Sequence, residues 1–273
     1  MSKNKNPLDD LKLPTKEELN ELSKKRREDL KRNINCMSNW FSLVKDLEIN
    51  IPKTKIINFP LEEYEDDCFN LFEGGEMTNK LKDFEQKLIK EINNFGTPCF
   101  MKSGTFSSKH DWEKTCYVKD SDRVFKQWLN IMYNSMMFGT PSSHYIVLRE
   151  LIDTKKELYA FKNLPITKER RYFFEKDKVT SHHPYWPPNA LENNIISNEN
   201  WEKELSKINK ESKKEVKKIK ELSLIVGKSL SKLHDNWSID WLQDKEGNWW
   251  LIDVAAKEQS YIWKDYPKLT WGL

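Results

Sequence analysis

The stretch WSIDWLQDKEGNWWLID, residues 237–253, constrains the fold of this chain more than any other segment. Apolar and aromatic residues flank a turn-forming DKEG sequence on both sides, which is typical of a β-hairpin. Asp240 and Asp253 nevertheless stand inside the two predicted strands. A carboxylate in apolar surroundings needs a positive partner or solvent, so both aspartates are candidate functional residues.

The spacing of the two aspartates predicts that they share one face of the hairpin. With DKEG as a four-residue loop, Asp240 pairs with Leu251 and Ser238 pairs with Asp253. The two carboxylates are then diagonal neighbours with Cβ atoms about 7–8 Å apart. Mg²⁺ suits such a pair, because it binds one or two carboxylates together with water and phosphate oxygens. A loop longer or shorter by one residue would separate the aspartates, and solvent-facing aspartates on an edge hairpin are the alternative.

Composition bounds the classes of function. The chain has 273 residues, 33% of them charged, with a net charge of only +3, which does not favour nucleic acid as a partner. Its four cysteines form no C-x-x-C pair, so we expect a reducing, cytoplasmic location rather than a zinc site or disulfides. No apolar run approaches the roughly 20 residues of a membrane span, and the first 14 residues lack an apolar signal core.

Hydrophobic periodicity predicts a mixture of helices and strands. Residues 1–14 are expected to form a flexible tail. Helices are expected over 15–33, 35–47, 77–95, 123–137 and 201–234, and strands over 55–59, 98–102, 145–152, 170–174 and in the hairpin at 237–254. The order lacks a regular βαβ alternation, which favours the α+β class. The lysines of the 201–234 helix form a solvated face, with contact to a partner or nucleic acid as the alternative.

A phosphate-binding segment is predicted at MKSGTFSSK, residues 101–109. A loop of small residues lets backbone N–H groups approach phosphate oxygens, and Lys102 and Lys109 supply positive charge. The Walker pattern and G-x-G-x-x-G are both absent from the chain. A plain turn is the alternative for such a loop.

Together these motifs resemble the ATP-grasp superfamily over about residues 98–263. The strand and loop with Lys102 and Lys109 resemble its phosphate-binding part, and VLRELI at 147–152 resembles its adenine hinge. ERRYF at 169–173 resembles the E-x-R-x-F strand of relatives of the eukaryotic cell-division-cycle assembly factor for translation initiation factor two. MKSGTFSSKHDW, HHPYW and WSIDWL…GNWWLIDVA resemble small ATP-grasp proteins of phages and bacteria.

The resemblance implies two α+β subdomains that clasp ATP with two Mg²⁺ ions, preceded by an N-terminal helical extension. The implied regions are 1–33 (tail and charged helix), 34–97 (pre-ATP-grasp region), 98–146 (phosphate-loop subdomain) and 147–273 (hinge and magnesium subdomain). The implied cofactor-binding residues are Lys102, Ser103, Lys109, Leu148, Arg149, Glu150, Leu151 and Glu169. Lys109 and Arg171 take catalytic roles, with Arg171 facing the γ-phosphate or acyl phosphate, and Asp240 and Asp253 ligate magnesium.

One departure concerns the second magnesium. Many ATP-grasp enzymes have Asn two positions after the last acidic ligand, where this chain has Ala255. Glu258 is a weak candidate to substitute for it. The departure puts full ligase activity in doubt.

The resemblance implies an ATP- and Mg²⁺-dependent ligase that joins a carboxylate to an amine or thiol through an acyl phosphate. The acceptor is an unidentified small molecule, peptide or protein. One alternative is an ATP-binding assembly chaperone without turnover, and another is a nucleic-acid-binding or phage structural protein.

Three further features allow more than one interpretation. His110 is either a general base or phosphate contact, or a surface histidine. The HHPYWP segment, residues 182–187, is expected to form a pocket wall that shapes the acceptor site. A metal site at His182 and His183 is the less favoured alternative, because adjacent strand residues face opposite ways. The eleven tryptophans are expected mainly in the core.

Overall fold

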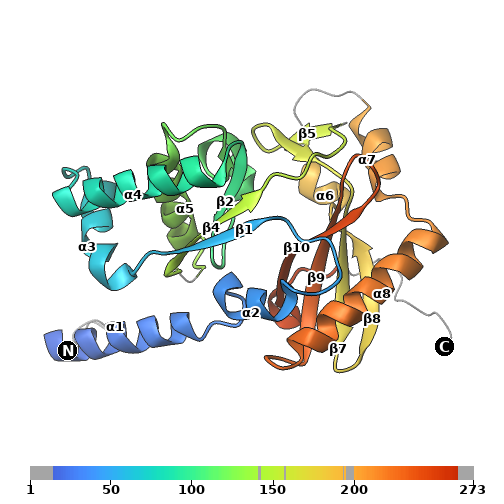
Figure 1. Cartoon of the computed structure of the whole chain (residues 1–273), viewed down its shortest axis with the longest axis horizontal. Coiled ribbons are helices and arrows are strands. Elements are labelled where there is room, and N and C mark those ends of the chain that lie inside the picture. The colour runs from blue at the N-terminus through green and yellow to red at the C-terminus, as the bar shows by residue number, and fades with distance from the viewer. Residues whose placement is uncertain (1–14, 141–142, 157, 193, 195–199, 264–273) are drawn as a thin grey trace, which may run out of the picture.

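The computed structural model describes residues 15–140, 143–156, 158–192, 194 and 200–263, so the expected tail at 1–14 lies outside the described residues. Helices and antiparallel sheets are mixed, which confirms the α+β class. Figure 1 shows two groups of strands beside each other, each with its own helices. The first group comes from the N-terminal half of the chain and the second from the C-terminal half.

The first sheet has the strand order β1-β4-β2-β3 and is antiparallel throughout. Its half of the chain comprises α1 (Lys16–Lys31), α2 (Met37–Val44), β1 (Thr54–Asn58), α3 (Leu61–Phe72), α4 (Asn79–Phe95), β2 (Cys99–Ser103), the 3₁₀ helix η1 (Lys109–Lys114), β3 (Tyr117–Val118), α5 (Val124–Met137) and β4 (Tyr145–Glu150). Because β1 pairs with β4, this sheet takes strands from both sides of residue 97. Helix α3 was not predicted, since it buries only Leu61 and Cys68.

The second sheet has the order β10-β9-β7-β8 and is also antiparallel. Its half comprises β5 (Leu158–Ala160), β6 (Leu164–Ile166), β7 (Glu169–Glu175), β8 (Lys178–Pro184), α6 (Pro188–Leu191), α7 (Trp201–Asn209), α8 (Lys213–Leu230), β9 (Asn236–Gln243), β10 (Trp249–Ala256) and the 3₁₀ helix η2 (Lys257–Gln259). Helix α8 covers one face so closely that a Cβ at Gly227 would lie 2.2 Å from the Phe174 ring. Only glycine permits this approach.

The single helix expected over 201–234 is wrong, because the chain breaks it between α7 and α8. Lys210 has extended backbone angles, φ −65° and ψ 128°. Ser212 then caps α8, its Oγ accepting from the Glu215 N–H at 3.2 Å. The carbonyls of Ile208 and Lys210 each accept from buried Arg170 at 3.0 Å. The S-x-x-E signature at Ser212 could have predicted this helix start.

The predicted register of the 237–254 hairpin is also wrong. The loop has five residues, 244–248, and Trp249 pairs with Gln243 while Leu251 pairs with Trp241. Continued regularly, this register would turn Asp253 to the face opposite Asp240.

A β-bulge restores the aspartate pair. The register shifts between Leu251 and Asp253, so that Ile252 is an extra residue and Asp253 pairs directly with Asp240. A bulge sets two residues against one on the partner strand and so changes the facing of the later residues of its own strand. The two aspartates therefore share a face as expected, but for a different reason.

The expectation that the tryptophans lie mainly in the core is confirmed. The largest fully buried side chains include Trp40, Trp128, Trp237 and Trp241. All four cysteines are buried and unpaired. Among the described residues, no helix combines the length and apolar character that crossing a membrane requires.

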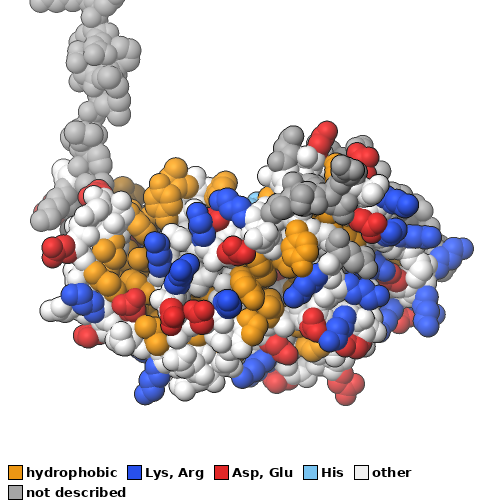
Figure 2. Space-filling model, turned by 90° about the horizontal axis from the view of Figure 1, so that it is seen from above, with side chains coloured by type: hydrophobic (Ala, Val, Ile, Leu, Met, Phe, Trp, Pro, Cys, Tyr) orange, Lys and Arg blue, Asp and Glu red, His pale blue; other side chains and the backbone are white. Residues whose placement is uncertain are grey.

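Seen from above, hydrophobic side chains gather over the N-terminal half, and Lys and Arg cluster at the far end of the C-terminal half (Figure 2).

Candidate functional site

A row of four directly paired residues crosses the second sheet. Each strand contributes one member: His183 from β8, Arg171 from β7, Asp240 from β9 and Asp253 from β10. Directly paired residues in a sheet lie on the same face. The opposite face carries Tyr172, Phe174, Ile239 and Trp241, which pack in an apolar core with α8. The second sheet therefore has one face with the charged row and one mainly apolar face, which also carries Arg170 in ion pairs with Glu211 and Glu215.

Arg171 and Asp240 form a two-point ion pair at the centre of this row. Arg171 Nε donates to Asp240 Oδ1 at 2.8 Å and Nη2 donates to Oδ2 at 2.7 Å. Both side chains are largely buried, with 13% and 8% of their surfaces exposed. Burial opposes the charge of Arg171, but Asp240, Tyr185 and Asp253 together outweigh burial, so the pKa of Arg171 is raised.

Lys102 connects the two sheets. It lies on β2 of the first sheet, and its Nζ is 2.6 Å from Asp253 Oδ2 on the second. The Lys102 side chain is only 4% exposed, whereas the Asp253 side chain is 39% exposed. The Asp253 carboxylate therefore pairs with the Lys102 ammonium and is also partly exposed to solvent.

Lys109 forms the second cationic point. Its Nζ lies 3.5 Å from Glu169 Oε2 and 3.9 Å from the centre of the Tyr185 ring. Trp186 Nε1 donates to the other oxygen, Glu169 Oε1, at 3.0 Å. Burial acts to lower the pKa of Lys109, but Glu169, Tyr185 and Asp240 together outweigh burial, so the pKa is raised. Burial raises the pKa of Glu169, and Lys109 offsets part of that effect.

The small-residue loop after β2 is ordered mainly by its own side chains. Ser103 Oγ accepts from the N–H groups of Thr105 at 3.3 Å and Phe106 at 2.9 Å. The Gly104 N–H donates to Ser143 Oγ at 3.0 Å, and a Cβ on Gly104 would lie 2.3 Å from Cys36 Sγ. Ser103 thus shapes the loop, and the N–H groups of 104–106 are engaged within the chain. A phosphate would have to meet the later part of the loop, at 107–109.

The four residues expected to form the adenine hinge, 148–151, do not all lie in the same part of the structure. Leu148 and Arg149 lie inside β4, which pairs with β1 on one side and β2 on the other. The Glu150 N–H donates to Lys53 O at 2.9 Å. Leu151 follows the strand and packs against the cluster that contains Trp186. Among residues 148–151, only Leu151 follows the end of β4, so its backbone groups are the ones not committed to the sheet.

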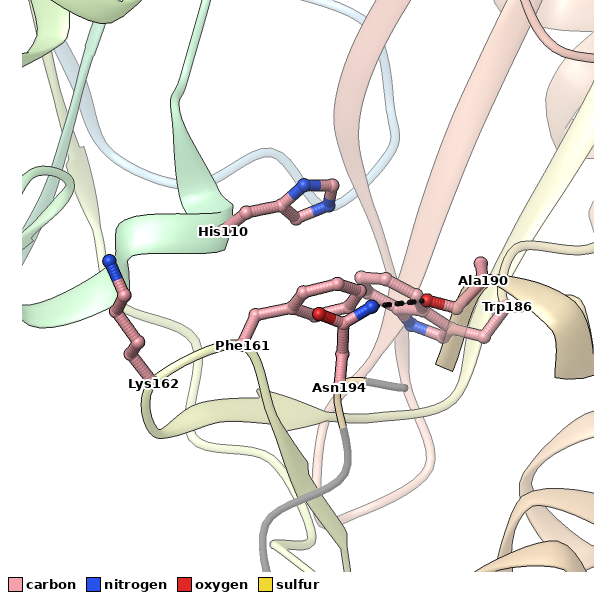
Figure 3. A pocket seen from close by; sticks show the side chains of 6 residues that line it. All are labelled: His110, Phe161, Lys162, Trp186, Ala190 and Asn194. Carbon is pink, nitrogen blue, oxygen red and sulfur yellow. Dashed lines mark hydrogen bonds between the residues drawn. The ribbon is translucent and has the colours of Figure 1, made fainter. Parts of the chain in front are cut away.

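A pocket of about 580 Å³ opens beside the phosphate loop (Figure 3). Its lining residues are His110, Phe161, Lys162, Trp186, Ala190 and Asn194. His110 stacks on Phe161 at 4.2 Å between ring centres, and burial together with Lys109 lowers the pKa of His110. Because Trp186 also contacts Glu169, the pocket shares a wall with the Lys109–Glu169 pair. Trp186 belongs to the HHPYWP segment that was expected to form a pocket wall, whereas Phe161 was not singled out from the sequence.

His182 and His183 point to opposite faces of β8. His182 Nδ1 lies 3.3 Å from Glu211 Oε1. His183 Nδ1 pairs with the Pro184 carbonyl at 2.8 Å and lies beside Arg171 in the row. The two imidazoles therefore do not share a metal, as expected from strand geometry.

The oxygen donors of the row fit a magnesium ion. Asp240 and Asp253 are direct neighbours, and hard carboxylate oxygens are the ligands that Mg²⁺ prefers. Within the described ranges, no group of three or more His, Cys, Asp or Glu residues gathers as for a metal held by protein alone. Two carboxylates would leave the other positions of Mg²⁺ to water and phosphate.

Position 255, where a ligand for a second magnesium ion would be expected, has no donor side chain. Ala255 pairs with Ser238, and its methyl group cannot ligate. Glu258 is engaged elsewhere, with His234 at 3.4 Å and Asn236 at 3.2 Å. Asn35 reaches the neighbouring strand position, but its Oδ1 accepts from the Ala256 N–H at 2.6 Å.

Comparison with known proteins supports the fold rather than an activity. No protein-family model and no curated protein sequence matches the chain. Among solved structures, C-terminally truncated Cdc123 from Schizosaccharomyces pombe aligns with TM-score 0.51 and 15% identity, over 84% of this chain and 85% of that one. The VanG D-Ala:D-Ser ligase from Enterococcus faecalis aligns with TM-score 0.47 and 14% identity, over 82% of this chain and 52% of that one. The chain shares its overall fold with Cdc123.

Proposed function

We propose that the chain is an ATP- and Mg²⁺-dependent, ligase-like enzyme of the cytoplasm. The observation that carries this proposal is the Arg171–Asp240–Asp253 row, which faces Lys102 of the other sheet. Cations and carboxylates meet there in a largely buried setting between two sheets. Such a set can bind a metal–triphosphate, since phosphate oxygens take the cations and the metal takes the carboxylates.

The basic side chains would position and neutralise the phosphates. Lys102 and Lys109 approach from the first half of the fold, and Arg171 approaches from the second. Each now pairs with a carboxylate, so nucleotide binding would exchange these intramolecular partners for phosphate oxygens. Burial strengthens such interactions, because solvent screens them less.

Asp240 and Asp253 are the residues that would hold magnesium. When bound, the ion supplies charge neutralisation between the phosphates. Asp253 has the more exposed carboxylate and can accept the ion without leaving the sheet. Asp240 would first have to release part of its two-point contact with Arg171. We therefore expect metal binding and reorientation of Arg171 to be coupled.

The chemistry we propose joins a carboxylate to an amine or thiol. A carboxylate oxygen attacks the γ-phosphorus of ATP, so that an acyl phosphate forms and ADP leaves. The amine or thiol then attacks the acyl carbon, inorganic phosphate leaves, and the nucleophile loses its proton. Arg171 would stabilise the transferred phosphoryl group. The acceptor is an unidentified small molecule, peptide or protein.

Thermal unfolding with ATP, with and without Mg²⁺, tests nucleotide binding. ATP at 100 times its Kd should stabilise the protein by about 2.7 kcal/mol, and Asp253→Asn should weaken the Mg²⁺-dependent part. Glu246→Gln, in the turn of the same hairpin and 57% exposed, is the matched control and should behave as wild type. The absence of any nucleotide effect on the wild type would contradict the proposal.

An ATP-binding assembly factor is the second candidate. Ala255 supplies no second-metal ligand. Tyr133 (46%) and Met137 (68%) of α5 and its C-cap residue Phe138 (75%) are exposed. Exposed apolar side chains of this kind are often covered by a protein partner. Release of ADP that requires both a carboxylate and an amine or thiol would favour the ligase. ATP binding without such release would favour the assembly factor.

A further inference from the structure

The bulge in β10 is consistent with the pattern of burial along this strand. Leu251 and Val254 both belong to the apolar core formed with α8. They are three residues apart, whereas side chains on a regular strand share a face only at even spacing. Ile252 is the extra residue that reconciles the two positions. The same extra residue places Asp253 opposite Asp240.

Arg149 holds the backbone of this bulge. Its Nη2 donates to the Leu251 carbonyl at 3.2 Å, and Nη1 donates to the carbonyl of the bulged Ile252. Its Nε donates to Thr54 Oγ1 at 3.2 Å, which orients the guanidinium from β1. Arg149 itself is only 4% exposed. A planar guanidinium with several fixed donors is suited to hold two neighbouring carbonyls at once.

We propose that Arg149 is a positioning residue for the metal-binding carboxylates, which clamps the Ile252 bulge and so keeps Asp253 beside Asp240. This inference rests on the proposed function for its consequence, because it assigns the two aspartates to a metal. It gives Arg149 a role in the hairpin rather than in contact with adenine. Arg149 also lies two residues before Leu151. The clamp therefore links β4, the strand that precedes the expected adenine hinge, to the Asp240–Asp253 pair.

Loss of the clamp should favour a regular strand. Without Arg149, the carbonyls of Leu251 and Ile252 lose their donors in a buried setting, which is unfavourable. A regular ladder would place Ile252 opposite Asp240 and turn Asp253 to the other face. The first aspartate would stay in place while the second left the site.

The first test is Arg149→Met, which keeps a long side chain and removes every donor. We expect the affinity for ATP without Mg²⁺ to change less than about twofold, and the gain in affinity from Mg²⁺ to fall by about 10- to 100-fold, as for other residues that orient metal ligands. Isothermal titration with ATP, with and without Mg²⁺, measures both quantities. Arg149→Lys should restore part of the gain. Thr54→Val, which removes the orienting contact together with the bond from the Thr54 hydroxyl to the Pro52 carbonyl, should lose less of it.

Deletion of Ile252 separates register from other effects of Arg149. Without the extra residue, Asp253 meets Asp240 in a regular ladder and no clamp is needed. Arg149→Met should therefore leave the Mg²⁺ gain unchanged in the deletion background. An equal loss in both backgrounds would overturn the proposal, since Arg149 would then act through its charge or through general stability.

If the deletion variant does not fold, a double-mutant cycle of Arg149 with Asp253 tests the proposal instead. Because both changes remove Asp253 from the metal, Arg149→Met combined with Asp253→Asn should lose no more Mg²⁺ gain than either change alone. Additive losses would overturn the proposal.

The register can also be read without any ligand. Cross-strand NOEs between the backbones of Asp240 and Asp253 should be present in the wild type and absent in Arg149→Met. Their persistence in the variant would overturn the proposal. If wild-type protein shows these NOEs but no Mg²⁺-dependent binding, the proposed function fails while the clamp stands.

Discussion

The two faces of the second sheet share every strand and yet have opposite chemistry. One face carries Tyr172, Phe174, Ile239 and Trp241, which are completely buried against α8 and its neighbours. The other carries Arg171 and Asp240, each one position away along its strand. A shift of one residue therefore separates the apolar core from the charged row.

The difference teaches that the two faces are stabilised in different ways. Apart from the ion pairs of Arg170, the mainly apolar face gains free energy by removing hydrocarbon from water, which does not depend on specific partners. On the charged face Arg171 and Asp240 are largely buried, so each charge that is removed from solvent there must be paired. Its ion pairs are therefore specific, and substitutions on the two faces should have different consequences.

The largest stability effect is expected on the apolar face, for Trp241→Ala. Trp241 is fully buried, and its Nε1 donates to Ser223 Oγ at 2.9 Å. Its loss should lower the free energy of unfolding by about 3–5 kcal/mol, because the neighbours cannot fill the space. Urea unfolding measures this. Leu242→Ala, the next residue and on the other face, is the control and should cost clearly less; equal losses would break the contrast between the faces.

The next effect concerns the ion pair of the charged face. Arg171→Met or Asp240→Asn alone leaves one charge buried without its partner and should lower the free energy of unfolding by about 3 kcal/mol. The double variant should cost much less than the sum of the two. A double-mutant cycle from urea unfolding measures the coupling. Additive losses would show that the pair is not specific.

A smaller effect links the charged face to pH. Burial lowers the pKa of His183, with Arg171 acting in the same direction, and burial followed by Lys109 lowers the pKa of His110. Unfolded histidine has a pKa of about 6.5, so below that pH the unfolded chain binds protons that the native chain does not. The free energy of unfolding should therefore fall as the pH drops below about 6.5.

The slope of that fall is at most about 1.4 kcal/mol per pH unit for each such histidine. His183→Gln should reduce it by one histidine's share, as measured by urea unfolding from pH 7.5 to 5. An unchanged slope would show that His183 does not stay neutral in the native protein.

The smallest effect tests how α8 is held over the apolar face. Ser212→Ala removes the side chain that caps α8 and should cost about 1 kcal/mol. Ser206→Ala, within α7 and away from either helix start, is the matched control and should change the free energy by less. A loss as large as that of Trp241→Ala would mean that the cap organises more than the helix end.

Local patterns predicted most of the elements that build this site. The strand ending at Lys102 and Ser103, the small-residue loop, the ERRYF strand and the 237–254 hairpin all occur where their residue types favour them. Their relative placement could not be read from the chain, because it depends on contacts between distant segments. The Lys102–Asp253 and Lys109–Glu169 pairs join residues 151 and 60 positions apart.

The bulge shows where sequence reasoning failed. A fixed period of two, applied from an assumed loop, gave the wrong partners for Asp240 and Asp253. Leu251 and Val254 already indicated a change of facing, since both are apolar at odd spacing. The residue that holds the bulge is Arg149, about a hundred residues earlier in the chain, and no pattern near the hairpin points to it.

The sequence by itself determined which segments alternate, where the aspartates stand in their strands, and the resemblance of the motifs to ATP-grasp proteins. Local residue preferences act over a few positions and can be recognised one segment at a time. Only the tertiary structure decided that four strands would each contribute one residue to a single row. That outcome depends on the register of three strand pairs at once, and each register is set by packing, by the bulge and by the clamp from the other sheet.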